Sequence, residues 1–114
     1  MDNCIFCKII SGEIPSRKVF EDDQLLVIED STPQAPLHLL LIPKKHYANC
    51  LDLAAVDESL VGHVFIMAGE IARQKGVDES GFRIVQNNGV GAGQSVFHIH
   101  FHLLAGRAFA WPPG

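Results

Sequence analysis

GQSVFHIHFHLL, at residues 93–104, alternates histidine with apolar residues through its central part. Such alternation is typical of a β-strand, because successive side chains of a strand point to opposite faces. We therefore predict a strand over residues 96–104. His98, His100 and His102 would share one face of it, about 7 Å apart in succession, and the apolar residues between them would face a buried core. These three are half of the chain's 6 histidines, so the pattern indicates function rather than a polar strand face.

Three imidazoles on one face suit two kinds of chemistry. Imidazole is the commonest metal ligand, and two histidines separated by one residue can share a zinc ion. Neutral imidazole is also a nucleophile toward phosphorus, and its neighbours can donate protons or hydrogen bonds to phosphate oxygens. The glycine-rich segment NNGVGAG at 87–93 favours phosphoryl chemistry, since glycines let the backbone approach an anion closely. Ser95 adds a hydroxyl donor.

Hydrophobic periodicity predicts the other elements. Residues 58–75 carry apolar side chains at spacings of three and four and should form one long helix, with Asp57 as its N-cap and Gly76 at its end. A short apolar stretch at 5–10 suits one or two helical turns. Four further strands are expected, at residues 18–21, 25–29, 38–43 and 82–86. Adjacent strand pairs and one long helix indicate an α+β fold with a mainly antiparallel sheet.

Composition limits the class of protein. A chain of 114 residues with 47% hydrophobic residues suits one globular domain over residues 1–114. The formal net charge of -4 argues against a duplex nucleic acid as partner. No apolar run approaches the roughly 20 residues of a membrane helix, and we see no secretory signal, so a membrane partner is not expected. The odd number of cysteines, 3, favours a reducing compartment, and we expect a cytoplasmic protein.

Cys4 and Cys7 have the spacing of half a zinc site. On this spacing alone, two buried thiols in an apolar N-terminal segment are an equally simple interpretation. A thioredoxin-like redox pair is disfavoured, because the motif does not follow a strand of a βαβ unit.

The segment HIHFHLL, 98–104, resembles the signature of the histidine-triad family, and the similarity covers nearly the whole chain. DSTPQAPLH at 30–38, IPKKH at 42–46, the glycine segment and the closing WPPG at 111–114 look like the nucleoside phosphoramidase branch of that family. The resemblance implies a five-stranded antiparallel sheet with one long and one short helix. It also implies a two-fold homodimer whose sheet continues across the interface.

The resemblance further implies the roles of the site residues. His100 is the expected nucleophile, His102 contacts the phosphate or helps to protonate the leaving group, and His38 orients the catalytic imidazole. His98 completes the expected catalytic set. The residues expected to bind the nucleotide, together with His100 and His102, are Asp30 at the ribose, Ser31 at the base, and Asn87, Gly93 and Ser95 at the phosphate and leaving group.

The implied activity is hydrolysis of a purine nucleotide phosphoramidate, of the adenosine or guanosine type, at the α-phosphate through a covalent nucleotidyl-histidine. The alternatives are a dinucleoside polyphosphate hydrolase of the same superfamily and a non-enzymatic nucleotide-binding adaptor. Catalysis should need no cofactor. A structural zinc is a further implication, held by Cys4, Cys7, His46 and His98.

Overall fold

The computed structural model describes residues 3–114. Residues 3–114 form two α-helices, five strands and three short 3-10 turns, with three consecutive strands before the long helix and two strands after it. The elements are α1 (Ile5–Ser11), β1 (Lys18–Glu21), β2 (Leu25–Glu29), β3 (Leu37–Pro43), the turns Cys50–Asp52 and Ala55–Asp57, α2 (Glu58–Gln74), β4 (Phe82–Val85), the turn Val90–Ala92, and β5 (Phe101–Ala105).

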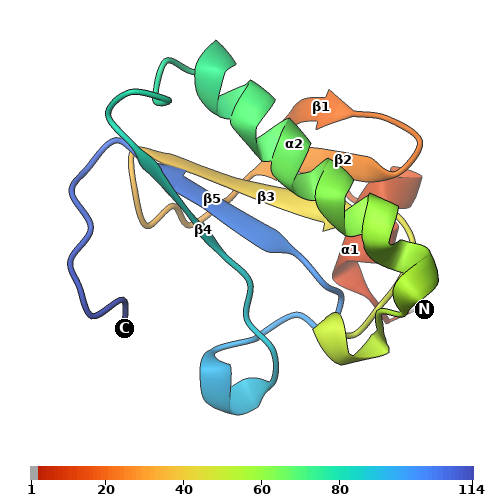
Figure 1. Ribbon diagram of the computed structural model, residues 1–114. Helices are drawn as coiled ribbons and strands as arrows, with labels where there is room; N and C mark the ends of the chain where they lie inside the picture. Colours follow the sequence, from red (N-terminus) through yellow and green to blue (C-terminus); the bar gives the residue numbers. More distant parts are fainter. Residues whose placement is uncertain (1–2) are drawn as a thin grey trace.

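The five strands form one antiparallel sheet in the order β1-β2-β3-β5-β4 (Figure 1). The turn between β1 and β2 closes where Asp22 accepts the N–H groups of Gln24 and Leu25, both at 2.8 Å. β3 lies in the middle of the sheet, paired with β2 on one side and β5 on the other. Because β3 and β5 are neighbours, His38 and His102, 64 residues apart, come onto one face of the sheet.

The sheet separates two apolar clusters. α2 covers one face, where Leu60, Val64 and Ile71 pack against side chains of β2, β3 and β5. α1 lies against the opposite face, where Phe6 and Ile9 pack with alternate residues of β2 and β3 (Figure 1). The predicted helices and strands are confirmed to within a residue or two, apart from the histidine strand, and so is the predicted α+β class.

The start of α2 differs from the prediction in its capping. Asp57 is the N-cap residue, but its carboxylate does not accept a helix N–H. It accepts the Tyr47 hydroxyl at 2.5 Å and the Ala54 N–H at 2.9 Å. Asp57 therefore joins the loop after β3 to the start of α2. At the other end, Gly76 adopts a φ of 72° and ends the helix as expected.

The strand predicted over residues 96–104 is the main correction. β5 begins only at Phe101, so the expectation of three histidines on one face of one strand is wrong. The pairing of β3 with β5 does not extend to Ile99, because the main-chain groups there have other partners. The Ile99 N–H donates to the Tyr47 carbonyl at 2.7 Å, and the Pro43 carbonyl accepts from His98 Nε2 at 2.7 Å. Ile99, Phe101 and Leu103 are nevertheless buried against α2, as the alternation predicted.

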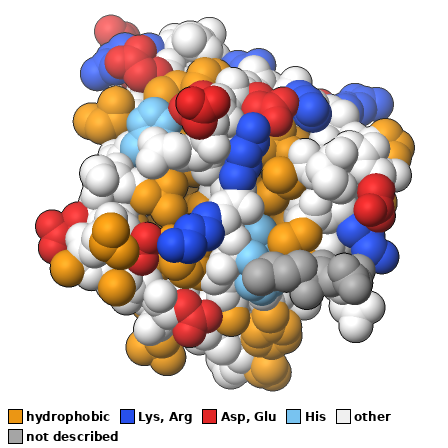
Figure 2. All heavy atoms as spheres, turned by 90° about the vertical axis from the view of Figure 1, so that its right-hand side faces the viewer, with side chains coloured by type: hydrophobic (Ala, Val, Ile, Leu, Met, Phe, Trp, Pro, Cys, Tyr) orange, Lys and Arg blue, Asp and Glu red, His pale blue; other side chains and the backbone are white. Residues whose placement is uncertain are grey.

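The surface carries charges of both signs. On the face in Figure 2, acidic and basic side chains are interspersed with small apolar groups, so the described part of this face does not present the continuous basic surface that a duplex would require. None of the helices in residues 3–114 combines the length and the apolar run that a bilayer crossing demands.

Gly106, directly after β5, lies close to Pro36, directly before β3. Gly106 has a φ of +94°, and a Cβ there would lie 2.8 Å from Cβ of Pro36. We expect Gly106→Ala to lower the free energy of unfolding by about 2–4 kcal/mol, through backbone strain plus the steric clash. Denaturant unfolding measures the change.

Gly81→Ala is the matched control. Gly81 has a φ of +109° but meets nothing within 4 Å, so alanine there adds only the backbone cost, about 1 kcal/mol. Equal losses in the two variants would contradict a close contact between Gly106 and Pro36.

Candidate active site

A cleft of about 1000 Å³ opens on the α1 side of the sheet. This volume is at the upper end of the range for small-molecule sites. Apolar side chains of α1 and of the segment that follows it form one part of its lining, and the loop after β2 forms another. The polar residues that line it include Asp30, Ser31, Ser95, His38, His100 and His102.

His100 is held in a defined tautomer. Its Nδ1 lies 2.7 Å from the backbone carbonyl of His98. A carbonyl only accepts, so Nδ1 carries the proton and the Nε2 of neutral His100 keeps its lone pair. Burial lowers the pKa of His100, which favours this neutral form. Phe6 packs edge-on against the ring, with centroids 4.9 Å apart, and so fixes its plane.

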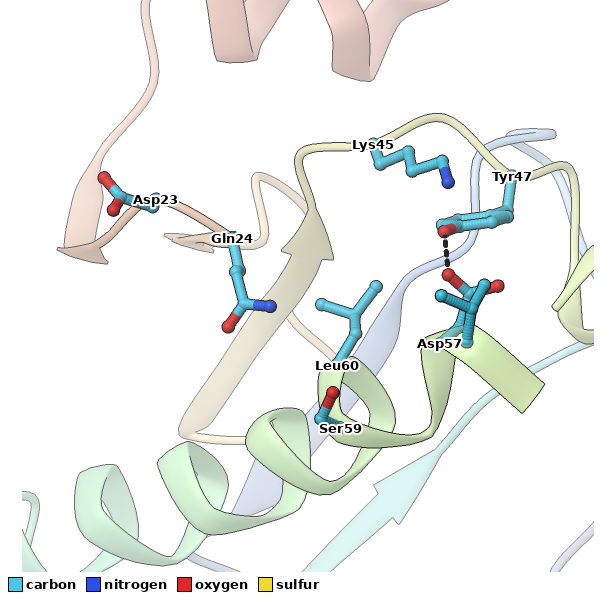
Figure 3. A pocket seen from close by; sticks show the side chains of 8 residues that line it. Asp23, Gln24, Lys45, Tyr47, Asp57, Ser59 and Leu60 are labelled. Atoms are coloured by element: carbon cyan, nitrogen blue, oxygen red, sulfur yellow. Dashed lines mark hydrogen bonds between the residues drawn. The ribbon is translucent and has the colours of Figure 1, made fainter. Parts of the chain in front are cut away.

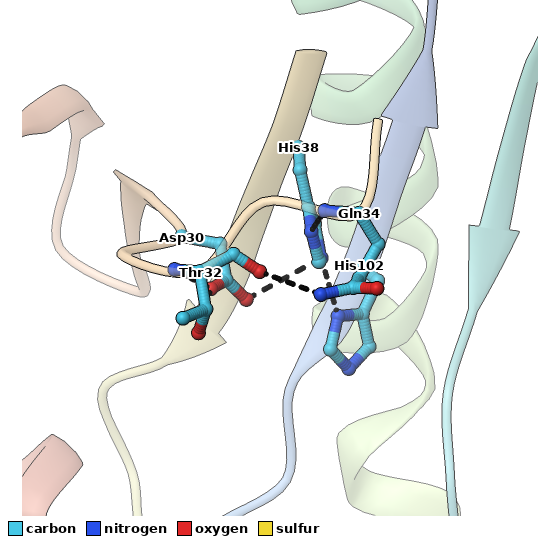
Figure 4. Close-up of polar contacts among 5 residues, drawn as sticks. All are labelled: Asp30, Thr32, Gln34, His38 and His102. Atoms are coloured by element: carbon cyan, nitrogen blue, oxygen red, sulfur yellow. Dashed lines mark hydrogen bonds and ion pairs between the residues drawn. The ribbon is translucent and has the colours of Figure 1, made fainter. Parts of the chain in front are cut away.

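His38 and His102 form a connected pair (Figure 4). The His102 ring lies beside that of His100, with centroids 5.1 Å apart. His38 Nδ1 accepts the Gln34 N–H at 3.0 Å, and His38 Nε2 lies 2.8 Å from His102 Nδ1. Asp30 Oδ2 lies 3.4 Å from His38 Nε2, while Oδ1 accepts the Thr32 N–H at 2.8 Å. Burial lowers the pKa of His102 to about 4, helped by the neighbouring His100 and His38, and burial also lowers the pKa of His38.

The glycine-rich loop is tied down by one buried amide. Gln94 is only 4% exposed, and its Oε1 accepts the Gly89 N–H at 2.7 Å. Its Nε2 donates to the carbonyls of Ala48 and Val96, at 2.6 and 3.1 Å. The loop is therefore fastened both to the segment after β3 and to the segment that leads to His98.

A second polar cluster joins the start of α1 to the segment before β5. His98 Nδ1 lies 3.3 Å from Cys4 Sγ, 3.6 Å from Cys7 Sγ and 3.0 Å from His46 Nδ1. Cys7 Sγ also lies 3.4 Å from His46 Nδ1, and the four atoms are all within 4.8 Å of one another. Since His98 Nε2 donates to the Pro43 carbonyl, its Nδ1 presents a lone pair to the cluster.

This donor set fits a tetrahedral zinc ion. Zinc bonds of about 2.0–2.1 Å to nitrogen and 2.3 Å to sulfur separate neighbouring ligand atoms by about 3.3–3.8 Å. Four of the six separations between the donor atoms are 3.0–3.6 Å, near these values, and all six are within 4.8 Å. In the thiol form, burial and the adjacent Cys4 raise the pKa of Cys7 to about 11. A bound cation would favour the thiolate instead.

The three histidines of the motif belong to two different sites. His100 and His102 line the cleft, whereas His98 belongs to the cluster with the two cysteines. The ring of His98 is fully buried in the Cys4–Cys7–His46 cluster and does not line the cleft; only its carbonyl reaches His100. The four predicted metal ligands come together. Asn87 and Gly93 lie outside the lining of the cleft, whereas Ser31 and Ser95 belong to it.

Three contributors to this arrangement were not predicted from the sequence, namely Phe6, the Gln34 amide and Gln94. Phe6 stands between the two cysteines, in the apolar stretch at 5–10, where its residue type does not distinguish it from its neighbours. The amide of Gln34 is a main-chain group, so residue type gives no signal for its contact with His38 Nδ1. Gln94 adjoins the glycines, and a glutamine directly after a flexible loop is a signal that could have been used.

A smaller pocket, of about 250 Å³, lies beside the start of α2 (Figure 3). Its polar groups largely engage one another: the Tyr47 hydroxyl donates to Asp57, and Lys45 Nζ lies 5.2 Å from the Tyr47 ring centroid. Tyr47 also accepts the Ile99 N–H through its carbonyl. This pocket supports the loop after β3 and adds no group to the histidine cleft.

Comparison with known proteins agrees with the fold and the motif. The HIT domain family matches residues 11–109, and the chain belongs to this histidine-triad family. A HIT family hydrolase from Legionella pneumophila has a crystal structure that is 51% identical, with a TM-score of 0.96 over 98% of this chain and 100% of that one. The "14 kDa zinc-binding protein" of Brassica juncea is 50% identical over 113 residues, 96% of this chain and 98% of the relative.

A structure with lower sequence identity is also similar. The histidine triad nucleotide-binding protein from Candida albicans is 34% identical, with a TM-score of 0.83 over 96% of this chain and 83% of that one.

Proposed function

We propose that the chain is a hydrolase that cleaves purine nucleotide phosphoramidates at the α-phosphate. The observation that carries the proposal is the tautomer of His100, since the His98 carbonyl leaves Nε2 of a neutral imidazole free to attack. The named relatives support the class, one being a hydrolase and one a nucleotide-binding protein.

The reaction has two steps. His100 Nε2 forms a bond to phosphorus as the phosphorus–nitrogen bond breaks, and the electron pair leaves with the nitrogen, which takes up a proton from solvent. Water then attacks the nucleotidyl-histidine, releasing the nucleoside monophosphate, a proton and neutral His100. The Nδ1–H remains on the ring throughout and donates to the His98 carbonyl, which stabilises the positive charge of the intermediate.

The cleft offers groups for each part of such a substrate. The Asp30 carboxylate suits the ribose hydroxyls as a bidentate acceptor, and Ser31 stands at the same end of the cleft for the base. For the phosphate, His102 lies beside His100, and Ser95 is a further polar group in the lining of the cleft. Asn87 and Gly93 would reach the leaving group only if the glycine loop closes toward the cleft.

Replacing the nucleophile provides the direct test. We expect His100→Ala to lower kcat for an adenosine phosphoramidate about a thousandfold or more, because the covalent route disappears, while AMP still binds. Steady-state kinetics and calorimetric titration with AMP measure the two effects.

His63→Ala is the control, since His63 lies on α2, paired with Asp22 at 2.6 Å and away from the cleft. Its kcat should equal that of the wild type. Turnover close to wild type in His100→Ala would refute the nucleophile, and AMP binding without any turnover in the unaltered protein would favour an adaptor.

We also propose that Cys4, Cys7, His46 and His98 hold a structural zinc ion. Zinc would supply no chemistry in the cleft; it would fasten the start of α1 to the segment that carries His100. The zinc-binding relative and the separations of the four donor atoms support this assignment.

Loss of the thiols should affect stability more than rate. Zinc at about 100 times its Kd stabilises a folded protein by about 2.7 kcal/mol, which raises the Tm of a small domain by about 10 °C or more. Cys4→Ser/Cys7→Ser should lose this rise, while Cys50→Ser, an exposed thiol, should keep it. Metal analysis and melting curves with and without zinc test the site. A rise in Tm with zinc in the double variant equal to that of the wild type would contradict it.

A homodimer is the third proposal. β4 is an edge strand with one side unpaired in the described sheet, so two copies can continue the sheet. On α2, Phe65 and Ile66 are 50% and 66% exposed and offer an apolar surface to the same partner.

The mass in solution tests the dimer. Light scattering should give twice the 12.5 kDa of one chain. Ile66→Asp should shift the protein toward monomer, because it places a charge in the apolar contact, whereas Val56→Asp, at a position 81% exposed before α2, should not. A monomeric wild type at micromolar concentration would exclude the proposal.

A further inference from the structure

We propose that the main-chain amide of Gln34, acting through His38, holds His102 as a neutral hydrogen-bond donor. His102 then contacts the phosphate through Nε2–H and is not the acid that protonates the leaving group. Only the statement that His102 contacts a phosphate rests on the proposed function.

The first link is the contact between Gln34 and His38. A main-chain N–H can only donate, so His38 Nδ1, 3.0 Å from it, must present its lone pair. Neutral His38 therefore carries its proton on Nε2. A second proton on Nδ1 would face the Gln34 N–H and break this bond, and because His38 is only 6% exposed, solvent would not replace it.

The proton on His38 Nε2 in turn determines which nitrogen of His102 is protonated. The His38 Nε2–H has two acceptors in reach: His102 Nδ1 at 2.8 Å and Asp30 Oδ2 at 3.4 Å. The shorter contact is the stronger hydrogen bond, so His102 Nδ1 accepts. Neutral His102 must then carry its own proton on Nε2. Figure 4 shows that this second nitrogen points away from His38, and His102 lines the cleft.

The pair consequently has no place for an extra proton. Each nitrogen of His38 and Nδ1 of His102 is engaged in a hydrogen bond, and Nε2 of His102 is already protonated. The titratable groups around His102 are His100, His38 and Asp30, of which only Asp30 is negatively charged. Burial outweighs that single carboxylate, in agreement with a pKa of His102 far below its ordinary value.

A neutral donor suits the proposed chemistry. Its Nε2–H can stabilise the negative charge on a phosphate oxygen as the bond to His100 forms, as preorganised donors do in other active sites. If neutral His102 gave up this proton it would become an imidazolate anion, which is far too unstable to be formed here. A cationic His102 would also place a positive charge beside the His100 ring, whose centroid is 5.1 Å away.

Gln34 allows a matched pair of variants. Gln34→Ala removes the side chain, which donates to the Thr32 carbonyl at 3.0 Å, but keeps the amide N–H. Gln34→Pro removes the N–H itself. Both keep the Gln34 carbonyl that accepts from Arg107 Nε at 3.0 Å. Without the N–H, His38 can move its proton to Nδ1 and accept at Nε2, which permits a proton on His102 Nδ1.

The experiment is a pH titration of protein labelled with ¹⁵N-histidine, followed by NMR, which reports the tautomer and the pKa of each ring. We expect wild type and Gln34→Ala to show Nε2–H on both His38 and His102, with His102 neutral at about pH 5. Gln34→Pro should raise the pKa of His102 by about one unit or more. AMP should shift the His102 Nε2–H resonance in the wild type.

A His102 that titrates near its ordinary pKa in the wild type, or that carries its proton on Nδ1, overturns the inference, as does an equal pKa in the two Gln34 variants. The wild-type spectrum alone decides the matter if Gln34→Pro does not fold. Failure of AMP to bind overturns the phosphate contact and the proposed function with it, whereas a wrong tautomer in a protein that binds AMP overturns this inference alone.

Discussion

The 2.7 Å hydrogen bond from His100 Nδ1 to the His98 carbonyl is the contact on which the site depends. It exists because the antiparallel ladder ends before this segment, so the carbonyl of His98 is free to accept from a side chain rather than from a neighbouring strand. The ladder ends in turn because Pro43 and Tyr47 give their carbonyls to His98 Nε2 and to the Ile99 N–H. The late start of β5 thus sets the tautomer of His100.

His98 links the two polar sites through different atoms. Its ring belongs to the thiol and imidazole cluster, and its carbonyl belongs to the cleft. Phe6 makes a second connection, since it stands between Cys4 and Cys7 and packs against the His100 ring. The cluster therefore holds both the backbone and the helix that orient His100, so a metal ion bound there would act on the cleft through structure.

Most of the fold could be predicted from local patterns. The spacing of Leu60, Val64 and Ile71 on one side of α2 and the alternation of Ile99, Phe101 and Leu103 both match buried faces. The place where β5 begins could not be predicted, because it depends on the Tyr47 carbonyl, more than 50 residues away. For the same reason, the regular alternation of residues 98–102 gives no sign that the His98 side chain lies in a different site from those of His100 and His102. The Gln34 amide is a main-chain group, and residue type carries no signal for it.

The central claim is that His100 forms a covalent bond to the substrate phosphorus. Protein mixed with an adenosine phosphoramidate, quenched in alkali within milliseconds to seconds and digested, can be searched by mass spectrometry for an adenylylated peptide. We predict an adenylyl group on the peptide that contains His100, appearing before free AMP accumulates and disappearing as substrate is exhausted. AMP formation with no adduct at any time, or an adduct on a different residue, would contradict the account.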